Sequence, residues 1–281
     1  MTQYRRAVIV GVGLLGGSIG LALKRRGIAH HVTGIGRDLR RLRIAQQLGA
    51  IDETAVELHE AIVGADLVVV CVPVHRIAPT VSQILAASSS PDLLVTDVGS
   101  TKASICQQVD QGGGHDRFCG AHPLAGSEKQ GVEHADAELF VDRLCIVTPT
   151  QRTHPEIVAR VEAFWQQLGS RTQRMTPADH DQALAWTSHL PHVLASALAS
   201  ATPDRLLPLV ASGWLDTTRV AAGGVELWQQ ILMDNRTAVL AALKEFHGDL
   251  GSWLSALESG DETTVASLLA AGKQKRDIVG S

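Results

Sequence analysis

Residues 7–16 read Ala-Val-Ile-Val-Gly-Val-Gly-Leu-Leu-Gly, and this stretch decides the fold of the first half of the chain. The apolar run Ala7–Val10, typical of a β-strand, leads directly into the glycine-rich segment 11–16. A helical pattern follows from about Leu15 to Arg26. Strand, glycine loop and helix in this order predict a dinucleotide-binding βαβ unit.

Each glycine of the loop has a distinct expected task. Gly11 allows the tight turn after the strand, Gly13 leaves room for a pyrophosphate, and Gly16 lets the helix approach the strand. The N-terminus of the helix adds N–H donors and the positive end of its dipole. The predicted cofactor-binding residues are Gly11, Gly13, Leu14, Leu15, Gly16, Arg37, Val72 and Pro73.

The end of the second predicted strand bears on the choice between NAD and NADP. Enzymes that prefer NAD usually place an acidic residue there to bind the ribose 2′-OH, but this chain has Gly36. The next residue, Arg37, suits the 2′-phosphate of NADP because a guanidinium offers paired N–H donors. NADP is therefore favoured, and Asp38 leaves NAD open, since a shift of one residue would make it the ribose ligand.

Strand and helix patterns alternate through the first half of the chain, which predicts a parallel sheet covered on both faces. The strand candidates are Ala7–Val10, Val32–Ile35, Leu67–Val72, Leu93–Asp97 and Leu144–Val147. From about Pro155 helical patterns take over, apart from a short strand near Arg171–Arg174. We predict an α/β Rossmann-type dinucleotide-binding domain at 1–154 and an all-α domain at 155–281, with a boundary that could lie as late as about 175.

The second half contains recognisable helix signals. Thr176-Pro177-Ala178-Asp179 is typical of a helix start, and Pro191 predicts a kink in the helix that follows. Apolar residues spaced by three and four predict two further helices, at about Leu227–Leu250 and Glu262–Lys275.

Composition excludes several classes of function. The 281 residues carry a net charge of −4, so no basic surface is expected for nucleic acid. The four cysteines match no metal or redox spacing and are interpreted as reduced thiols of the core. Residues 7–23 carry no charge, but five glycines among them argue against a signal peptide or membrane anchor. We therefore expect a cytoplasmic protein with no membrane partner and no metal.

Two segments after the predicted strands carry the candidate chemistry. They are Asp97-Val98-Gly99-Ser100-Thr101-Lys102 and Gly120-Ala121-His122-Pro123-Leu124-Ala125-Gly126. Ligands of such folds bind outside the carboxyl ends of the strands, so we expect both segments to be loops facing the cofactor. His122 is the acid-base candidate, because an imidazole can accept the proton of a hydroxyl whose carbon loses a hydride.

These residues carry a resemblance to a known family. The chain resembles the prephenate and arogenate dehydrogenases of tyrosine biosynthesis. The resemblance lies in the glycine loop, the segments at 97–100 and 121–126, Ser188-His189-Leu190-Pro191-His192 and Gly213-Trp214-Leu215-Asp216-Thr217-Thr218-Arg219. The resemblance implies oxidation and decarboxylation of a cyclohexadienyl acid, with hydride passing to NAD(P)⁺. It also implies a homodimer formed through the helical domain, which would carry substrate residues.

The resemblance further assigns roles to particular residues. His122 would polarise the ring hydroxyl, Ser100 would bind near the same hydroxyl and the nicotinamide, and Arg219 would bind a substrate carboxylate. The remaining predicted substrate residues are His192, Ser188, Trp228, His180 and Glu128. On a straight helix His180 and His192 would lie about 18 Å apart, so either Pro191 bends the helix or His180 serves the rim of the pocket.

Two other functions compete with this interpretation. A dehydrogenase of the 3-hydroxyacid type would use a catalytic lysine on the first long helix of the second domain, but no lysine lies between Lys129 and Lys244. A non-catalytic NADP-sensing dimer would not need His122, Ser100 and Arg219 together. The sequence leaves the choice between prephenate and arogenate open.

Overall fold

The computed structural model describes residues 3–126, 129 and 131–280. These residues divide into two compact units, with the division after Asn235. Within the described ranges, no helix combines enough length and apolar character to cross a bilayer.

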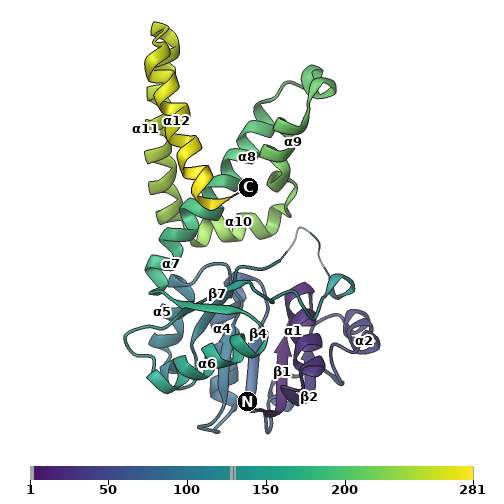
Figure 1. Ribbon diagram of the computed structural model, residues 1–281. Helices are drawn as coiled ribbons and strands as arrows, with labels where there is room; N and C mark the ends of the chain where they lie inside the picture. The colour runs from purple at the N-terminus through teal and green to yellow at the C-terminus, as the bar shows by residue number, and fades with distance from the viewer. Residues whose placement is uncertain (1–2, 127–128, 130, 281) are drawn as a thin grey trace. The chain divides into compact units, whose positions relative to one another are not determined.

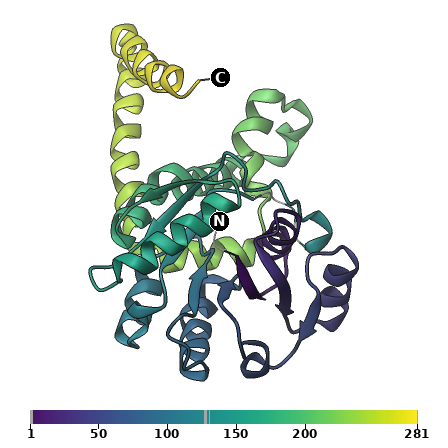
Figure 2. The same ribbon diagram turned by 60° about the horizontal axis from the view of Figure 1, so that its bottom comes forward.

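A five-stranded parallel sheet in the order β3-β2-β1-β4-β5 forms the centre of the first unit (Figures 1 and 2). Its strands are β1 (Tyr4–Val10), β2 (Ala29–Ile35), β3 (Glu53–Ala55), β4 (Leu67–Val70) and β5 (Leu94–Asp97). The helices between them are α1 (Leu14–Arg25), α2 (Leu39–Gln47), α3 (Leu58–Ala61), α4 (Val74–Ala87) and, after β5, α5 (Ala103–Gln111). The predicted Rossmann-type architecture is confirmed, and β3 is a strand that the sequence analysis did not find.

Alternate residues of the strands pack into two hydrophobic cores, one on each face of the sheet. Ile9 of β1 belongs to the core that includes α1 and α6 (Pro155–Gln167), whereas its neighbour Val8 belongs to the core that includes α4 and α5. Because successive side chains of a strand point to opposite faces, an apolar strand must be covered on both sides.

A smaller three-stranded sheet joins the edge of the parallel sheet. It consists of β6 (Gly120–Pro123), β7 (Leu144–Thr148) and β8 (Arg171–Arg174), with β6 antiparallel and β8 parallel to β7. A single bridge between Val95 and Phe118 connects it to β5. The expectation that His122 lies on a loop was wrong, because His122 pairs with Ile146 inside β6.

The remaining elements of the first unit are helical. They are α7 (Pro177–Leu184), a π-helical turn η3 (Ala185–His189), α8 (Leu190–Ala201), α9 (Ser212–Thr218), α10 (Val225–Asp234) and the 3₁₀ turns η1 (Gly114–Asp116), η2 (Val132–His134), η4 (Asp204–Leu209) and η5 (Arg219–Ala222). Thr176 caps α7 by accepting a hydrogen bond from the Asp179 N–H, as predicted. The π-turn ends at His189, two residues before Pro191, whose missing N–H removes one regular helical hydrogen bond.

The second unit is a helical hairpin of α11 (Arg236–Ser259) and α12 (Glu262–Val279). Gly260 makes the turn with a φ of +67°, and Asp261 caps α12 through the Thr264 N–H. The sequence predicted one helix from about Leu227 to Leu250, and this was wrong. The chain breaks between α10 and α11 at Asn235.

Candidate active site

The glycine loop between β1 and α1 has the geometry of a dinucleotide cradle. Gly11 has a φ of +96°, and a Cβ there would lie 2.5 Å from the Cys71 carbonyl oxygen. A Cβ on Gly16 would lie 2.1 Å from the Gly11 carbonyl oxygen, so both positions require glycine. A Cβ on Gly13 would meet no described atom within 4 Å. That space before the N-terminus of α1 fits a pyrophosphate.

The other predicted cofactor residues lie around this loop. Leu14 and Leu15 begin α1 and are partly buried. Val72 lies beside the loop, since its Cγ1 would be 3.2 Å from a Cβ on Gly11, and Pro73 is the residue directly before α4. Beyond β2, Arg37 is exposed.

Asp38 has a structural task that was not predicted. Its side chain caps α2, accepting hydrogen bonds from the N–H groups of Arg40 (2.9 Å) and Arg41 (3.4 Å). Oδ1 of Asp38 is therefore engaged by N–H groups in the first turn of α2.

A buried ion pair organises the chain after β5. Lys102 and Asp97 are fully buried and paired with each other, and the Lys102 ammonium also donates to the Ala121 carbonyl oxygen at 3.1 Å. Asp97 accepts a hydrogen bond from the Ala121 N–H at 3.1 Å. Because Asp97 ends β5 and Ala121 precedes His122, the pair fixes the strand that carries His122 next to the carboxyl edge of the parallel sheet. Ser100 lies in the same segment and is partly buried.

His122 takes part in a chain of three side chains. Its Nδ1 lies 2.9 Å from Nε2 of His180, and Nδ1 of His180 lies 2.7 Å from Oδ1 of Asp181. The two imidazole rings meet edge to face, with centroids 5.1 Å apart. His180 is fully buried and both of its ring nitrogens are engaged, so neither is free for a substrate.

The surroundings favour neutral imidazoles. Burial, the neighbouring His180 and the positive charge of Lys102 hold the pKa of His122 well below its ordinary value. Burial also lowers the pKa of His189, to about 4, although Asp181 opposes this shift. An imidazole that is neutral near pH 7 can act as a base.

A second group of predicted residues lies on α8, α10 and the turns beside them. The ring of His192 stacks on Trp228, with centroids 3.6 Å apart, and Nδ1 of His192 is buried without a hydrogen-bond partner among the described residues. Ser188 is partly buried in the π-turn, and Arg219 is exposed at the start of η5, which packs against α8. Glu128 lies outside the described residues.

The sequence analysis missed the residues that hold the histidines. Asp181 accepts hydrogen bonds from the N–H groups of Lys102 (2.7 Å) and Ala103 (2.9 Å), and its carbonyl accepts one from the Asn235 side chain at 2.7 Å. Asn235 also lies 3.0 Å from Nδ1 of His189. The position of Asp181 next to His180 was a signal that could have been used.

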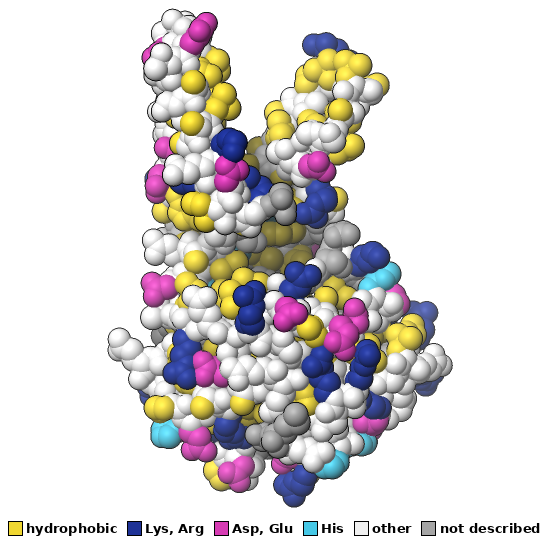
Figure 3. All heavy atoms as spheres, viewed as in Figure 1, with side chains coloured by type: hydrophobic (Ala, Val, Ile, Leu, Met, Phe, Trp, Pro, Cys, Tyr) yellow, Lys and Arg dark blue, Asp and Glu magenta, His cyan; other side chains and the backbone are white. Residues whose placement is uncertain are grey.

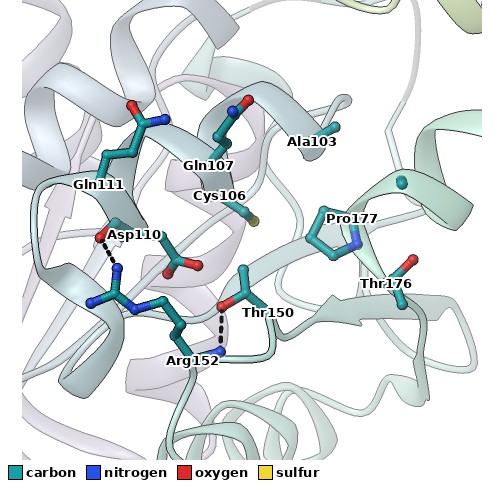
Figure 4. A pocket seen from close by; sticks show the side chains of 10 residues that line it. Ala103, Cys106, Gln107, Asp110, Gln111, Thr150, Arg152, Thr176 and Pro177 are labelled. Atoms are coloured by element: carbon teal, nitrogen blue, oxygen red, sulfur yellow. Dashed lines mark hydrogen bonds between the residues drawn. The ribbon is translucent and has the colours of Figure 1, made fainter.

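A cavity of about 350 Å³ lies between α5 and the start of α7 (Figure 4). Its lining includes Cys106, Arg152 and Thr176, and Arg152 donates to the Asp110 carbonyl oxygen there. None of the described predicted site residues lines it, so the cavity lies outside the group around His122. Among the described side chains, no set of three or more His, Cys, Asp and Glu residues could hold a metal ion, and all four cysteines are free thiols.

The fold and the site together define an NAD(P)-dependent dehydrogenase of the kind that joins a Rossmann-type domain to a helical one. A family model described as "Prephenate dehydrogenase, nucleotide-binding domain" matches residues 19–174, and one described as "Prephenate dehydrogenase, dimerization domain" matches residues 176–271. The chain belongs to the prephenate dehydrogenase family, and the resemblance noted from the sequence is confirmed.

Individual relatives agree with this assignment. A cyclohexadienyl dehydrogenase of Zymomonas mobilis is 33% identical over 270 residues, which cover 93% of this chain and 91% of that protein. A crystal structure of prephenate dehydrogenase from A. aeolicus with hydroxyphenyl propionate and NAD⁺ is 29% identical, with a TM-score of 0.89 and 98% of both chains covered. The Synechocystis arogenate dehydrogenase structure is 32% identical, with a TM-score of 0.85 and coverage of 98% of this chain and 99% of that one.

Proposed function

We propose that this protein catalyses the NAD(P)-dependent oxidative decarboxylation of prephenate or arogenate, giving 4-hydroxyphenylpyruvate or tyrosine. The observation that carries the proposal is the imidazole of His122, held next to the carboxyl edge of the parallel sheet in a chain that matches both domains of the family. No metal or covalent nucleophile is needed, because formation of the aromatic ring drives the loss of CO₂.

His122 is the proposed base for the ring hydroxyl. As the carbon that bears the hydroxyl loses its hydride, the hydroxyl proton moves toward His122. The bond from the ring to its carboxylate then breaks, CO₂ leaves, and the electron pair of that bond completes the aromatic ring. The proton returns to the phenolic oxygen, so no net proton is released. The bound nicotinamide supplies the acceptor for the hydride.

The other proposed roles concern orientation. Ser100 would bind beside the same hydroxyl and the nicotinamide, and Arg219 would hold a carboxylate through two charge-assisted hydrogen bonds. The unpartnered Nδ1 of His192 supports a contact with the polar side chain of the substrate, within a pocket that Ser188 and Trp228 would line. Glu128 stays a prediction from the sequence.

NADP is the proposed preferred cofactor. The space beside Gly13 supports a bound dinucleotide, and the absence of a side chain at Gly36 next to the exposed Arg37 supports the 2′-phosphate. The engagement of Asp38 as the cap of α2 weakens the case for Asp38 as a ribose ligand.

The helical part of the chain is the proposed site of dimerisation. Its match to a family model of a dimerization domain supports this, as do the exposed leucines Leu250, Leu254 and Leu257 of α11 and Leu269 of α12. Figure 3 shows hydrophobic side chains along this helical hairpin. We place the start of this domain near residue 175, because α6 packs into the core of the first sheet and β8 pairs with β7. A cytoplasmic location stays a prediction.

The direct test offers the purified protein prephenate and arogenate, each with NAD⁺ and with NADP⁺, and follows the absorbance of the reduced nicotinamide. We expect turnover of at least one substrate, and His122→Asn should lower kcat by about 10²-fold or more with little change in the KM of the cofactor. No turnover of either substrate, or near-normal turnover by the variant, would contradict the proposal.

A further inference from the structure

We propose that His180 and Asp181 are positioning residues that hold His122 in the one tautomer able to accept the hydroxyl proton of the substrate, and that stabilise the resulting imidazolium. This inference rests on the proposed function only for its kinetic consequences. The tautomer of His122 is a property of the protein itself and can be measured without substrate.

Asp181 determines which ring nitrogen of His180 carries the proton. Its two carboxylate oxygens accept hydrogen bonds from the N–H groups of Lys102 and Ala103, which lie at the N-terminus of α5. Both of these donors are N–H groups, so each carboxylate oxygen acts as an acceptor. An ionised carboxylate only accepts hydrogen bonds, so Nδ1 of His180, 2.7 Å away, must carry a proton and donate it.

The position of the proton on His180 then determines the position of the proton on His122. Burial holds the pKa of His180 below its ordinary value even though Asp181 raises it, so His180 carries a single proton near pH 7. With that proton on Nδ1, Nε2 of His180 is an acceptor. Nδ1 of His122, 2.9 Å from it, must then be the donor. A neutral His122 protonated on Nδ1 has a bare Nε2, which is the nitrogen left to accept a proton.

The charged groups around the pair support this arrangement. Burial, the neighbouring rings of His180 and His189, and the positive charge of Lys102 all disfavour a protonated His122 in the resting protein. Asp181 and Asp97 act on His180 in the opposite sense, because their negative charges favour its protonated form. A proton taken up by His122 is therefore stabilised through His180 by Asp181, as the aspartate of a catalytic triad stabilises its histidine.

Asp181 is held from three elements, which makes it suited to positioning. It belongs to α7, its carboxylate is bound by the first residues of α5, and its carbonyl accepts a hydrogen bond from Asn235 at the end of α10. This role differs from the substrate contact that resemblance suggested for His180, whose ring nitrogens are both occupied.

The first experiment reads the tautomers in the resting protein. Protein labelled with ¹⁵N in its histidine rings is studied by long-range ¹H–¹⁵N NMR near pH 7, and His122→Asn and His180→Gln assign the two signals. We expect a protonated Nδ1 and a bare Nε2 in both rings. A His122 protonated on Nε2 overturns the proposal. If the protein turns over neither substrate, the proposed function fails and this result still stands or falls by itself.

The second experiment separates the hydrogen bond from the packing. His180→Phe keeps a ring but removes the acceptor for Nδ1 of His122, and kcat/KM should fall by about 10²-fold. His180→Gln can restore an acceptor through its amide oxygen, so it should remain within about tenfold of the original kcat/KM. Equal losses in the two variants at unchanged Tm, or no loss in either, would overturn the proposal.

Asp181→Asn provides a readout that a purely structural role would not move. Loss of its negative charge makes a protonated His122 less stable, so the acid limb of the kcat/KM profile should move to lower pH while its plateau falls by at least about tenfold. The control is Asp179→Asn, which removes the same charge from an exposed position of α7. An unmoved acid limb in Asp181→Asn, or an equal shift in the control, counts against the proposal.

Discussion

The imidazole of His192 lies on the indole of Trp228, with ring centroids 3.6 Å apart and ring planes inclined by 12°. The backbone of Gly223 closes over this stack, because a Cβ there would lie 2.5 Å from Nε1 of Trp228 and 3.2 Å from Cε1 of His192. The helices α8 and α10 therefore meet at a contact that leaves no room for a methyl group. The stack also fixes the direction of the unpartnered Nδ1 of His192.

We expect Gly223→Ala to displace this stack and to raise the KM of the substrate by about tenfold or more, the effect of losing one hydrogen bond to a charged group. The KM of the cofactor should not change. Gly213→Ala is the matched control, since a Cβ there meets no described atom within 4 Å and alanine suits a helix. Steady-state kinetics on both variants checks this, and an unchanged substrate KM in Gly223→Ala would count against a role for the stack.

Two glycines of the cofactor loop should behave in opposite ways. Gly16→Ala places a Cβ 2.1 Å from the Gly11 carbonyl oxygen, so the loop must distort and Tm should fall by several degrees. Gly13→Ala places its methyl group in open space, so Tm should remain and only cofactor binding should weaken. Thermal unfolding with cofactor titration separates the two effects. Equal effects of the two variants on Tm would contradict the close contact at Gly16 and the open space at Gly13.

The contacts of this loop are local in the sequence, whereas those of other elements are not. The glycine loop was predictable because its contacts involve a strand, a turn and a helix adjacent in the chain. β6 was not, because Gly120–Pro123 has no strand pattern and becomes a strand only by pairing with β7. β3 was missed for a similar reason, since Glu53–Ala55 is short and polar and is set by its pairing with β2.

The site residues divide in the same way. His122 could be singled out from its neighbours in the sequence, but its partner His180 is 58 residues further along the chain. The break at Asn235 interrupts a helical pattern without any glycine or proline to mark it. Asn235 is explained only by the buried groups that it binds, the Asp181 carbonyl oxygen and Nδ1 of His189.

Burial of His189 predicts a loss of stability in acid. Its pKa falls from an ordinary 6.5 to about 4 in the folded protein, so between these values the unfolded chain binds a proton that the folded chain does not. The free energy of unfolding is therefore unaffected by His189 above about pH 6.5, and it decreases as the pH falls from 6.5 toward 4. At about 1.4 kcal/mol for each pKa unit, protonation of His189 lowers the free energy of unfolding by up to about 3 kcal/mol.

Urea unfolding from pH 7 to pH 4 measures this dependence. His189→Gln should flatten the fall in the free energy of unfolding over this range, because glutamine binds no proton. His247→Gln, which changes an exposed histidine of α11, should leave the slope as it was. The same slope in all three proteins would mean that His189 is not the group responsible.

The cofactor preference can be tested at one end of β2. Arg37 is exposed directly after Gly36, where no carboxylate can repel a 2′-phosphate. Arg37→Ala should raise the KM of NADP⁺ by about tenfold to 10²-fold, since a hydrogen bond between charged groups contributes about 1.5 to 3 kcal/mol, and the KM of NAD⁺ should change little. Arg43→Ala removes the same charge from an exposed position further along α2 and should alter neither value. Equal losses for both cofactors in Arg37→Ala would mean that the guanidinium binds a part common to both, and an unchanged KM for NADP⁺ would remove Arg37 from the site.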